Sequence, residues 1–260
     1  MSGIAFDDKL SRKLEAIYLT SDVVEQRRQV LAALQLAAGE HVLDIGSGPG
    51  LLAHAMAEAV GPQGRVCGVD RSEAMVAMAG RRCVQQPWAE FHSGDASKLA
   101  FPADSFHAAV STQVYEYVRD IPAALTELHR VLRPGGRAVI LDTDYGSLVI
   151  NTDHTERMSR VLKAWDEHFV HPDLPRKLSR QLREAGFVIR DRFAIPMFNP
   201  ELQDNTYGKG MLEMMASFAV GRNGVTQDEA DAWFAEFTAL NARGEFFFSL
   251  NRYLFVAGKL

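Results

Sequence analysis

The sequence predicts an α/β protein in which helices cover both faces of a mainly parallel β-sheet. Two observations support this prediction. Short β-rich runs alternate with helical runs between residues 41 and 136, and a glycine-rich turn directly follows the first β-rich run. Parallel strands need a long crossover, usually a helix, so such alternation is typical of a parallel sheet. A chain of 260 residues fits one elaborated domain of this class.

The elements of the first half follow in a regular order. Apolar residues recur at helical spacing over residues 22–36, which predicts a helix with Asp22 as its N-cap. The expected strands are 41–45, 65–69, 88–92 and 106–111, and the expected helices are 51–60, 72–85 and 121–132. An Arg-Pro-Gly-Gly turn at 133–136 stops the last of these helices, and 137–141 form a fifth strand.

The order of elements in the second half is irregular. The expected elements are helical segments at 152–170, 174–185, 209–218 and 227–240, a strand at 187–193 and a closing apolar strand at 246–257. We interpret residues 144–172 and 196–222 as insertions above the sheet that cap a substrate. An apolar stripe at i, i+3, i+4 and i+7 predicts a core-facing helix, with a flexible apolar lid as the alternative. The stripe consists of Met211, Met214, Met215 and Phe218.

Composition excludes several functions. A formal net charge of -5 gives no electrostatic reason to bind a polyanion, so nucleic acid is not an expected partner. Cys67 and Cys83 stand in apolar runs without other ligands at metal-binding spacing, which predicts buried thiols and no metal. The N-terminus lacks the apolar stretch of a signal peptide, and no run approaches the roughly 18 apolar residues of a membrane span. We therefore expect a cytoplasmic protein without stable membrane insertion.

The glycine turn indicates a nucleotide site. Gly46, Gly48 and Gly50 follow a strand and open a helix, and glycine lets a ligand lie against the backbone. A dinucleotide fingerprint would place its third glycine at position 51, which is Leu51. Asp44 before the turn would repel a pyrophosphate but attract an ammonium or sulfonium. The turn therefore favours a cationic aminoacyl nucleoside, unless Asp44 only caps the turn by side-chain hydrogen bonds.

Two further strand ends carry carboxylates. Asp70 ends the second strand about 20 residues beyond the turn, where a ribose-binding carboxylate belongs. Nicotinamide enzymes share this residue, so it does not separate the classes. Asp95 follows the third strand within Gly94-Asp95-Ala96, where it can accept from an adenine amine, although Gly-Asp is also a common turn pair.

Together these motifs resemble the class I S-adenosylmethionine-dependent methyltransferases, particularly the branch of ubiquinone/menaquinone-biosynthesis and small-molecule enzymes. The resemblance covers about residues 42–140 and rests on four motifs in order, which are specific together and weak singly. They are Val-Leu-Asp-Ile-Gly-Ser-Gly-Pro-Gly at 42–50, Gly-Val-Asp-Arg-Ser at 68–72 with Met75, Gly-Asp-Ala at 94–96, and a helix with the Arg-Pro-Gly-Gly turn at 128–136.

The resemblance implies a Rossmann-like sheet of seven strands with a reversed last strand, which residues 246–257 can supply. It also implies a cofactor-binding core at 39–143 and an N-terminal helical cover at 1–38, within a single domain. The implied contacts with S-adenosylmethionine are Tyr18 and Arg27 from the cover, Asp44, Gly46, Ser47 and Gly48 at the methionine part, Asp70, Arg71 and Met75 at ribose and adenine, Gly94, Asp95 and Ala96 at the adenine edge, and Ser111 and Gln113 near the transferring methyl group.

The fourth strand departs from the family pattern. The family often has a Glu-His pair after this strand, whereas this chain has Val-Tyr-Glu-Tyr at 114–117. The acceptor is therefore inferred from composition alone: the methionine stripe and several aromatic residues suggest a small apolar or aromatic molecule, with an oxygen, nitrogen or carbon acceptor left open. These aromatic residues are Tyr115, Tyr145, Trp165, Phe198 and Tyr207.

Methyl transfer needs alignment more than a reactive side chain, so no catalytic residue is assigned. A hydroxyl acceptor could need a base, for which His154, His168 and His171 are candidates. His168 and His171 could share a helix face, and a metal there is the less favoured interpretation. Two alternatives stay open: an NAD(P)-dependent oxidoreductase, and a catalytically silent cofactor-binding module of the same fold. A homodimer is also left open.

Overall fold

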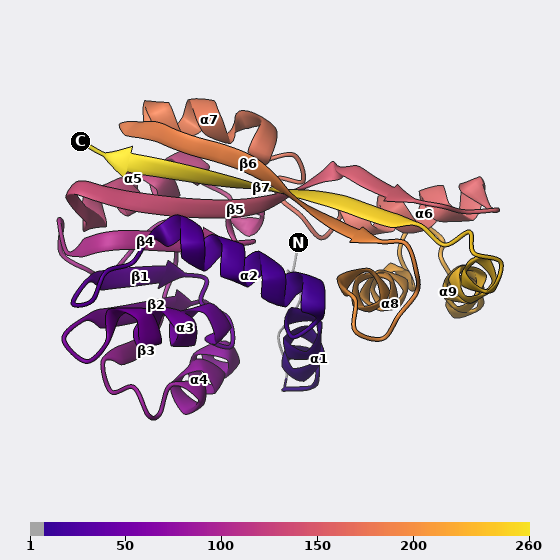
Figure 1. Ribbon diagram of the computed structural model, residues 1–260. Helices are drawn as coiled ribbons and strands as arrows, with labels where there is room; N and C mark the ends of the chain where they lie inside the picture. Colours follow the sequence, from indigo (N-terminus) through magenta and orange to yellow (C-terminus); the bar gives the residue numbers. More distant parts are fainter. Residues whose placement is uncertain (1–7) are drawn as a thin grey trace.

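The computed structural model describes residues 8–260, with side chains from residue 13 onward, and is built on one seven-stranded sheet (Figure 1). The spatial order is β3-β2-β1-β4-β5-β7-β6. The strands are β1 (His41–Ile45), β2 (Arg65–Asp70), β3 (Ala89–Ser93), β4 (Phe106–Thr112), β5 (Leu132–Ile150), β6 (Phe187–Asn199) and β7 (Phe248–Lys259). Neighbours from β3 to β5 are parallel, and β7 is antiparallel to both β5 and β6. The seven-stranded sheet with a reversed last strand is confirmed.

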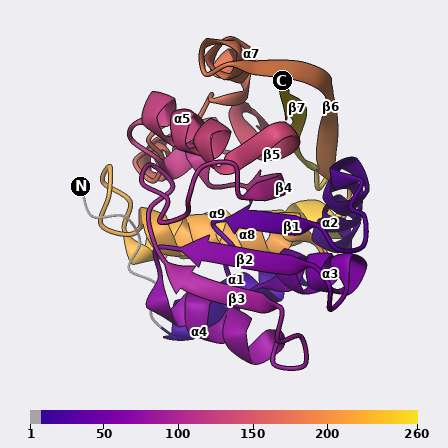
Figure 2. The same cartoon turned by 90° about the vertical axis from the view of Figure 1, so that its left-hand side faces the viewer.

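Helices cover both faces of the sheet (Figure 2). They are α1 (Asp8–Tyr18), α2 (Ser21–Leu34), α3 (Leu51–Val60), α4 (Glu73–Arg82), α5 (Ile121–Val131), α6 (Thr155–Asp166), α7 (Pro175–Glu184), α8 (Tyr207–Ala219) and α9 (Gln227–Ala242), with a 3₁₀ turn η1 (Tyr115–Tyr117) after β4. Alternate strand residues point to opposite faces, so β1 contributes Val42 to a core with α2 and α3, and Leu43 to a core with α5 and α7.

Beyond β4, the sheet continues into a second hydrophobic core. Figure 1 shows β5, β6 and β7 running past the short strands toward α6, α8 and α9. We call this part the helical lobe: α6, α8, α9 and the far ends of β5 to β7, with Ile17 of α1 packed against them. Its interior is aromatic, and Trp165, Trp233 and Phe237 are each at most 2% exposed. None of the helices within residues 8–260 is long and apolar enough to cross a membrane.

Several expectations for single elements are wrong. Residues 144–150 and 196–199 are not irregular insertions but continue β5 and β6, because β7 pairs with Asp144, with 149–150 and with 196–199. Asp22 is not the N-cap of α2, which is preceded by Thr20. Both Asp22 carboxylate oxygens instead accept the backbone N–H of Tyr207 at the start of α8, at 3.1 and 2.9 Å. Asp22 thus caps a helix that lies 185 residues away in sequence.

Other expectations hold. Gly135 has φ +78, and the Arg-Pro-Gly-Gly segment forms an irregularity between the two β4–β5 pairings on either side of it. In the methionine stripe, Met211 and Met215 are at most 1% exposed and belong to the lobe core, so the core-facing interpretation is confirmed. Cys67 and Cys83 are buried free thiols, and burial raises the pKa of each to about 11.

Candidate cofactor and acceptor site

The glycine turn lies between β1 and α3 and has the left-handed backbone that glycine allows. Gly46 and Gly48 have φ values of +72 and +52. A Cβ on Gly46 would lie 2.1 Å from Cγ2 of Val114, so the turn also packs tightly against the segment after β4. A Cβ on Gly48 would meet nothing within 4 Å. The turn is therefore closed on its β4 side and open at Gly48, where a ligand can approach the backbone.

Asp70 connects this turn to the end of β2. Its Oδ2 accepts the backbone N–H of Gly48 at 2.9 Å, and its Oδ1 accepts that of Ser72 at 2.9 Å. Ser72 in turn caps α4 by accepting the N–H of Met75 at 3.4 Å. Asp70 thus contacts the glycine turn directly, and Ser72 connects it to Met75 at the start of α4. Arg71, between them, is exposed.

Asp44 is buried, and part of its carboxylate has no partner. It is 1% exposed, and its Oδ2 has no hydrogen-bond partner among the described residues. Burial, helped by the charge of Asp70, raises the pKa of Asp44 to about 7. An unsatisfied buried carboxyl group is costly unless a donor or a cation binds it. The simple turn-capping interpretation does not account for this oxygen.

Further unpartnered polar atoms lie at the same edge of the sheet. Ser47 and Ser111 are at most 7% exposed, and neither hydroxyl has a partner among residues 13–260. Oδ2 of Asp142, two residues beyond the β5 partner of Ser111, is unpartnered as well. β1, β4 and β5 are neighbours, so these residues lie at one edge of the sheet, with Asp44 on one face and Ser111 and Asp142 on the opposite face. Buried donors and acceptors at this edge fit a polar ligand, because native cores rarely leave such groups unsatisfied.

The third predicted motif reaches the same corner. Gly94 donates its N–H to the carbonyl oxygen of Asp70 at 3.0 Å, which ties the loop after β3 to the end of β2. Asp95 is exposed, and its Oδ1 accepts the N–H of Ser97 at 2.8 Å. Ala96 is 6% exposed and packs in the core with α5. This places an exposed carboxylate one strand beyond Asp70.

Gln113 connects the end of β4 with β5. It has φ +56, an uncommon value for a residue other than glycine, and its N–H donates to the Leu141 carbonyl at 2.7 Å. Its side-chain Nε2 lies 3.4 Å from Oγ1 of Thr143. Backbone strain of this kind persists only where the surroundings enforce it, and it is frequent at functional sites.

Tyr18 and Arg27 approach the site from α1 and α2. The Arg27 guanidinium donates to the Tyr18 carbonyl oxygen, so the two helices are held together at this point. Burial, with smaller contributions from Tyr207, Asp70 and Glu116, raises the pKa of Tyr18 to about 12, although the charge of Arg252 opposes the rise. The Tyr18 phenol is therefore within electrostatic range of the Asp70 carboxylate.

Sequence analysis missed a buried carboxyl pair. Glu116 and Asp142 are each fully buried, and each side chain accepts backbone N–H groups from the segment that carries the other. Oδ1 of Asp142 accepts the N–H groups of Val114 and Glu116 at 3.2 and 3.4 Å, and Oε2 of Glu116 accepts that of Thr143 at 3.0 Å. Burial is the main cause that raises the pKa of Glu116 to about 7 and that of Asp142 well above its usual value. The only signal in the sequence was the departure from the family pattern at 114–117.

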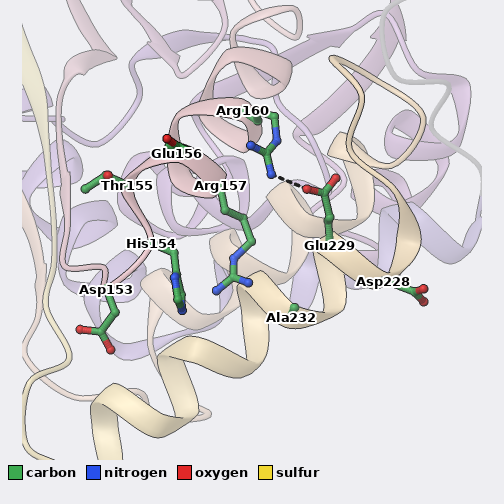
Figure 3. A pocket seen from close by; sticks show the side chains of 9 residues that line it. All are labelled: Asp153, His154, Thr155, Glu156, Arg157, Arg160, Asp228, Glu229 and Ala232. Atoms are coloured by element: carbon green, nitrogen blue, oxygen red, sulfur yellow. Dashed lines mark hydrogen bonds and ion pairs between the residues drawn. The ribbon is translucent and has the colours of Figure 1, made fainter.

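The three candidate histidines do not gather at this site. His154 precedes α6 and lines a hollow of about 490 Å³ between the first turns of α6 and α9 (Figure 3). Its lining residues are Asp153, His154, Thr155, Glu156, Arg157, Arg160, Asp228, Glu229 and Ala232. His168 and His171 share no helix face, since α6 ends at Asp166 and α7 begins at Pro175. Burial lowers the pKa of His168 to about 4, so it stays neutral among the aromatic rings of the lobe.

Comparison with known proteins identifies the family. The family described as methyltransferase domain matches residues 42–136. A demethylmenaquinone methyltransferase of Symbiobacterium thermophilum is 31% identical over 187 residues, covering 63% of this chain and 74% of that protein. A 2-phytyl-1,4-naphtoquinone methyltransferase of Synechococcus elongatus is 46% identical over 107 residues, 40% of this chain and 46% of that protein. The chain spans about half the length of the first curated relatives that it matches.

Similarity to solved structures concerns the fold. The phosphoethanolamine N-methyltransferase 2 of Haemonchus contortus, in complex with S-adenosyl-L-methionine, superposes with a TM-score of 0.63 at 19% identity, covering 97% of this chain and 57% of that one. The sheet, the glycine turn and the ordered carboxylates thus define a class I S-adenosylmethionine-dependent methyltransferase. Within that class, the chain belongs to the branch of the quinone-biosynthesis methyltransferases.

Proposed function

We propose that this protein binds S-adenosylmethionine at the carboxyl edge of β1, β2 and β3 and transfers its methyl group to a small apolar or aromatic molecule. The unpartnered buried carboxylate of Asp44 beside an open glycine turn is the main observation behind this proposal. An ammonium group would satisfy that carboxylate, whereas the pyrophosphate of a nicotinamide cofactor would be repelled by it.

The cofactor supplies an activated methyl group on a sulfonium. Asp44, Gly46, Ser47 and Gly48 would hold its methionine part, while Asp70, Arg71 and Met75 would hold ribose and adenine. Gly94, Asp95 and Ala96 would bind the adenine edge, with Ser111 and Gln113 toward the methyl group and Tyr18 and Arg27 above it. In this proposal the protein aligns the reactants and excludes water, since the acceptor atom itself displaces the sulfide.

The acceptor class follows from the two relatives and the helical lobe. The names of these relatives give naphthoquinone and menaquinone derivatives as the molecules those enzymes methylate. The lobe adds an aromatic interior in which Tyr145 stacks on Phe169 with ring centroids 3.8 Å apart. We propose that residues 144–172 and 196–222 contribute to an acceptor site, and that residues 1–38 cover the cofactor. We further propose a cytoplasmic, single-domain protein that does not bind nucleic acid, with a homodimer still open.

Cofactor binding tests the proposal. Calorimetry of S-adenosylmethionine against NAD on the wild-type protein should detect only the former. Asp70→Ala should weaken its binding by about 100-fold or more, because charge-assisted hydrogen bonds to the ribose hydroxyls are lost. Asp231→Ala, which removes an exposed carboxylate on α9, is the matched control and should leave the affinity unchanged. Equal affinity for the Asp70→Ala and wild-type proteins would contradict the site.

Transfer of a labelled methyl group tests the activity separately. The protein should label reduced 2-phytyl-1,4-naphthoquinone or a small molecule in an extract of its host. If S-adenosylmethionine binds but label enters only macromolecules or highly charged molecules, the acceptor proposal is wrong. If S-adenosylmethionine binds and no label is transferred, the result favours the alternative of a catalytically silent cofactor-binding module.

A further inference from the structure

Arg252 on β7 is a buried arginine without a carboxylate partner. It is 0% exposed, yet no carboxylate of the described residues lies within 4.0 Å of its guanidinium. More exposed arginines do have such partners: Arg137 pairs with Glu40 at 2.6 Å and Arg157 with Glu236 at 2.8 Å. The most deeply buried of these charges is therefore the one that lacks an opposite charge. Removing an unpaired charge from water is expensive, so this arrangement needs an explanation.

The local contacts satisfy only part of the guanidinium. One terminal nitrogen donates to Oε1 of Gln26 on α2, and the Tyr207 ring on α8 lies under the guanidinium carbon at 4.3 Å from its centroid. Nε has no partner among residues 13–260. A guanidinium has five N–H donors and stays protonated, and a neutral amide and a ring face balance neither its donors nor its charge.

Strand register places Arg252 on the acceptor side of the cofactor site. Asp44 pairs with Val110, and Val110 pairs with Val139. Side chains alternate along β5, so Val139 and Thr143 share the face on which Asp44 lies. Thr143 pairs with Arg252. Arg252 thus lies on the same face as Asp44, across three strands and about 13 Å further along the strand direction.

The neighbours of Arg252 connect it to the reacting end of the site. Thr143 receives the side chain of Gln113, which is expected near the transferring methyl group. The charge of Arg252 acts on the pKa values of Glu116, Tyr18 and Tyr145, so a carboxyl group and two phenols lie within its electrostatic range. Tyrosines of α1 and β5 therefore lie within electrostatic range of Arg252, and the Tyr207 ring of α8 contacts it directly.

We propose that Arg252 binds a negatively charged oxygen of the methyl acceptor and thereby selects acidic aromatic acceptors; this inference rests on the proposed function. The oxygen is a carboxylate or an ionised hydroxyl on the ring system, which the tyrosines flank. During transfer, the acceptor atom donates its electron pair to the methyl carbon as the carbon–sulfur bond breaks and that bonding pair stays on sulfur. Arg252 exchanges no proton and acts as a specificity-determining residue.

Entry of such an acceptor requires movement of the covering helices. Arg252 is enclosed by α2 and α8, and α1 packs closely on α8: a Cβ on Gly210 would lie 2.6 Å from Cγ1 of Ile17. Binding at Arg252 would therefore require α1 and α8 to separate, and the acceptor would exchange its hydration for the guanidinium and the neighbouring tyrosine rings.

A pair of isosteric probes tests the charge preference. We would measure binding of 2-naphthoate and 2-naphthamide to the protein saturated with S-adenosylhomocysteine. Wild type should bind 2-naphthoate at least tenfold more tightly than the amide, since a charge-assisted hydrogen bond is worth about 1.5–3 kcal/mol. Arg252→Met should lose this preference while its affinity for 2-naphthamide stays within about twofold. Arg176→Met, which removes an exposed guanidinium paired with Asp144, is the control and should keep the preference.

The outcomes separate a binding role from a structural one. If Arg252 only supports α2, its replacement lowers the melting temperature but the wild type shows no preference for the acid. Equal binding of both probes by the wild type, no binding of 2-naphthoate, or an unchanged preference in Arg252→Met would each overturn the proposal. If Arg252→Met fails to fold, the test uses Arg252→Lys together with the ratio of the wild-type affinities for 2-naphthoate and 2-naphthamide. Failure of the wild type to bind S-adenosylhomocysteine would instead count against the proposed function.

Discussion

The two halves of the sheet position their polar groups by different means. On the β1 to β3 side, local turns do so: Asp70 holds Gly48 and Ser72, which lie within 22 residues of it. On the β5 to β7 side, long-range pairing does so: Arg252 contacts Gln26, 226 residues away. A site of the first kind can be recognised from a motif, and a site of the second kind only from the folded chain. Under the proposed function, cofactor binding and acceptor selection would depend on different kinds of contact.

The largest loss of stability is expected from a large-to-small substitution in the core of the helical lobe. Trp233→Ala removes a fully buried ring that meets Phe237 edge to face, with centroids 4.8 Å apart. We expect the free energy of unfolding to fall by about 3–5 kcal/mol. Chemical denaturation measures this loss, and Phe234→Ala, at a partly buried neighbour, should cost less. If the halves are independent, affinity for S-adenosylmethionine stays within a few-fold; a parallel loss of affinity would break the comparison.

Two glycine substitutions should separate packing from binding in the other half. Gly46→Ala combines a positive φ with a clash against Val114, so a loss of about 3 kcal/mol in stability is expected. Gly48→Ala meets open space and should cost only about 1 kcal/mol. Its methyl group would nevertheless lie where the cofactor approaches, so its affinity for S-adenosylmethionine should fall more than its stability. The reverse ranking of melting temperatures would contradict this assignment.

The pH dependence of stability should reveal the buried carboxyl group of Asp44. Its folded pKa of about 7 exceeds the ordinary value of 3.8. The folded protein therefore retains a proton that the unfolded chain has released, and stability declines as the pH rises through this window. Relative to Asp44→Asn, the wild type should lose on the order of 2 kcal/mol between pH 5 and 7. Thermal unfolding of both proteins at several pH values measures the difference, and parallel curves would refute it.

The smallest effect is expected at the outer bend of β5. The ion pair between Arg176 and Asp144 has a distance of 2.8 Å, but the arginine side chain is 53% exposed. The Asp144 side chain is only 8% exposed, but the Gln amide can still donate a hydrogen bond to it, so Arg176→Gln should change stability by only about 1 kcal/mol. A larger loss in denaturation would mean that the helical lobe depends on this contact.

Periodicity and turn chemistry predicted most of the first half from sequence. Strand 41–45 and helix 51–60 agree with β1 and α3 at both ends. The cofactor corner was also predicted, since glycines and strand-end carboxylates are local signals. The lengths of β5 and β6 were not, because residues 144–150 and 196–199 owe their extended form to pairing with β7. Glu116, Asp142 and Arg252 were missed because a charged residue gives no sign in sequence that the fold will bury it.

The alternation of side chains along β7 limits how the length of this strand can vary among relatives. Leu254 and Arg252 point to the face covered by α2, whereas Tyr253 between them packs with the α5 and α7 core. A single inserted or deleted residue between Leu254 and Arg252 would exchange the guanidinium for a neighbouring side chain. Insertions and deletions in this stretch should therefore occur two residues at a time. The number of residues between Leu254 and Arg252 would then determine whether the guanidinium faces the acceptor site.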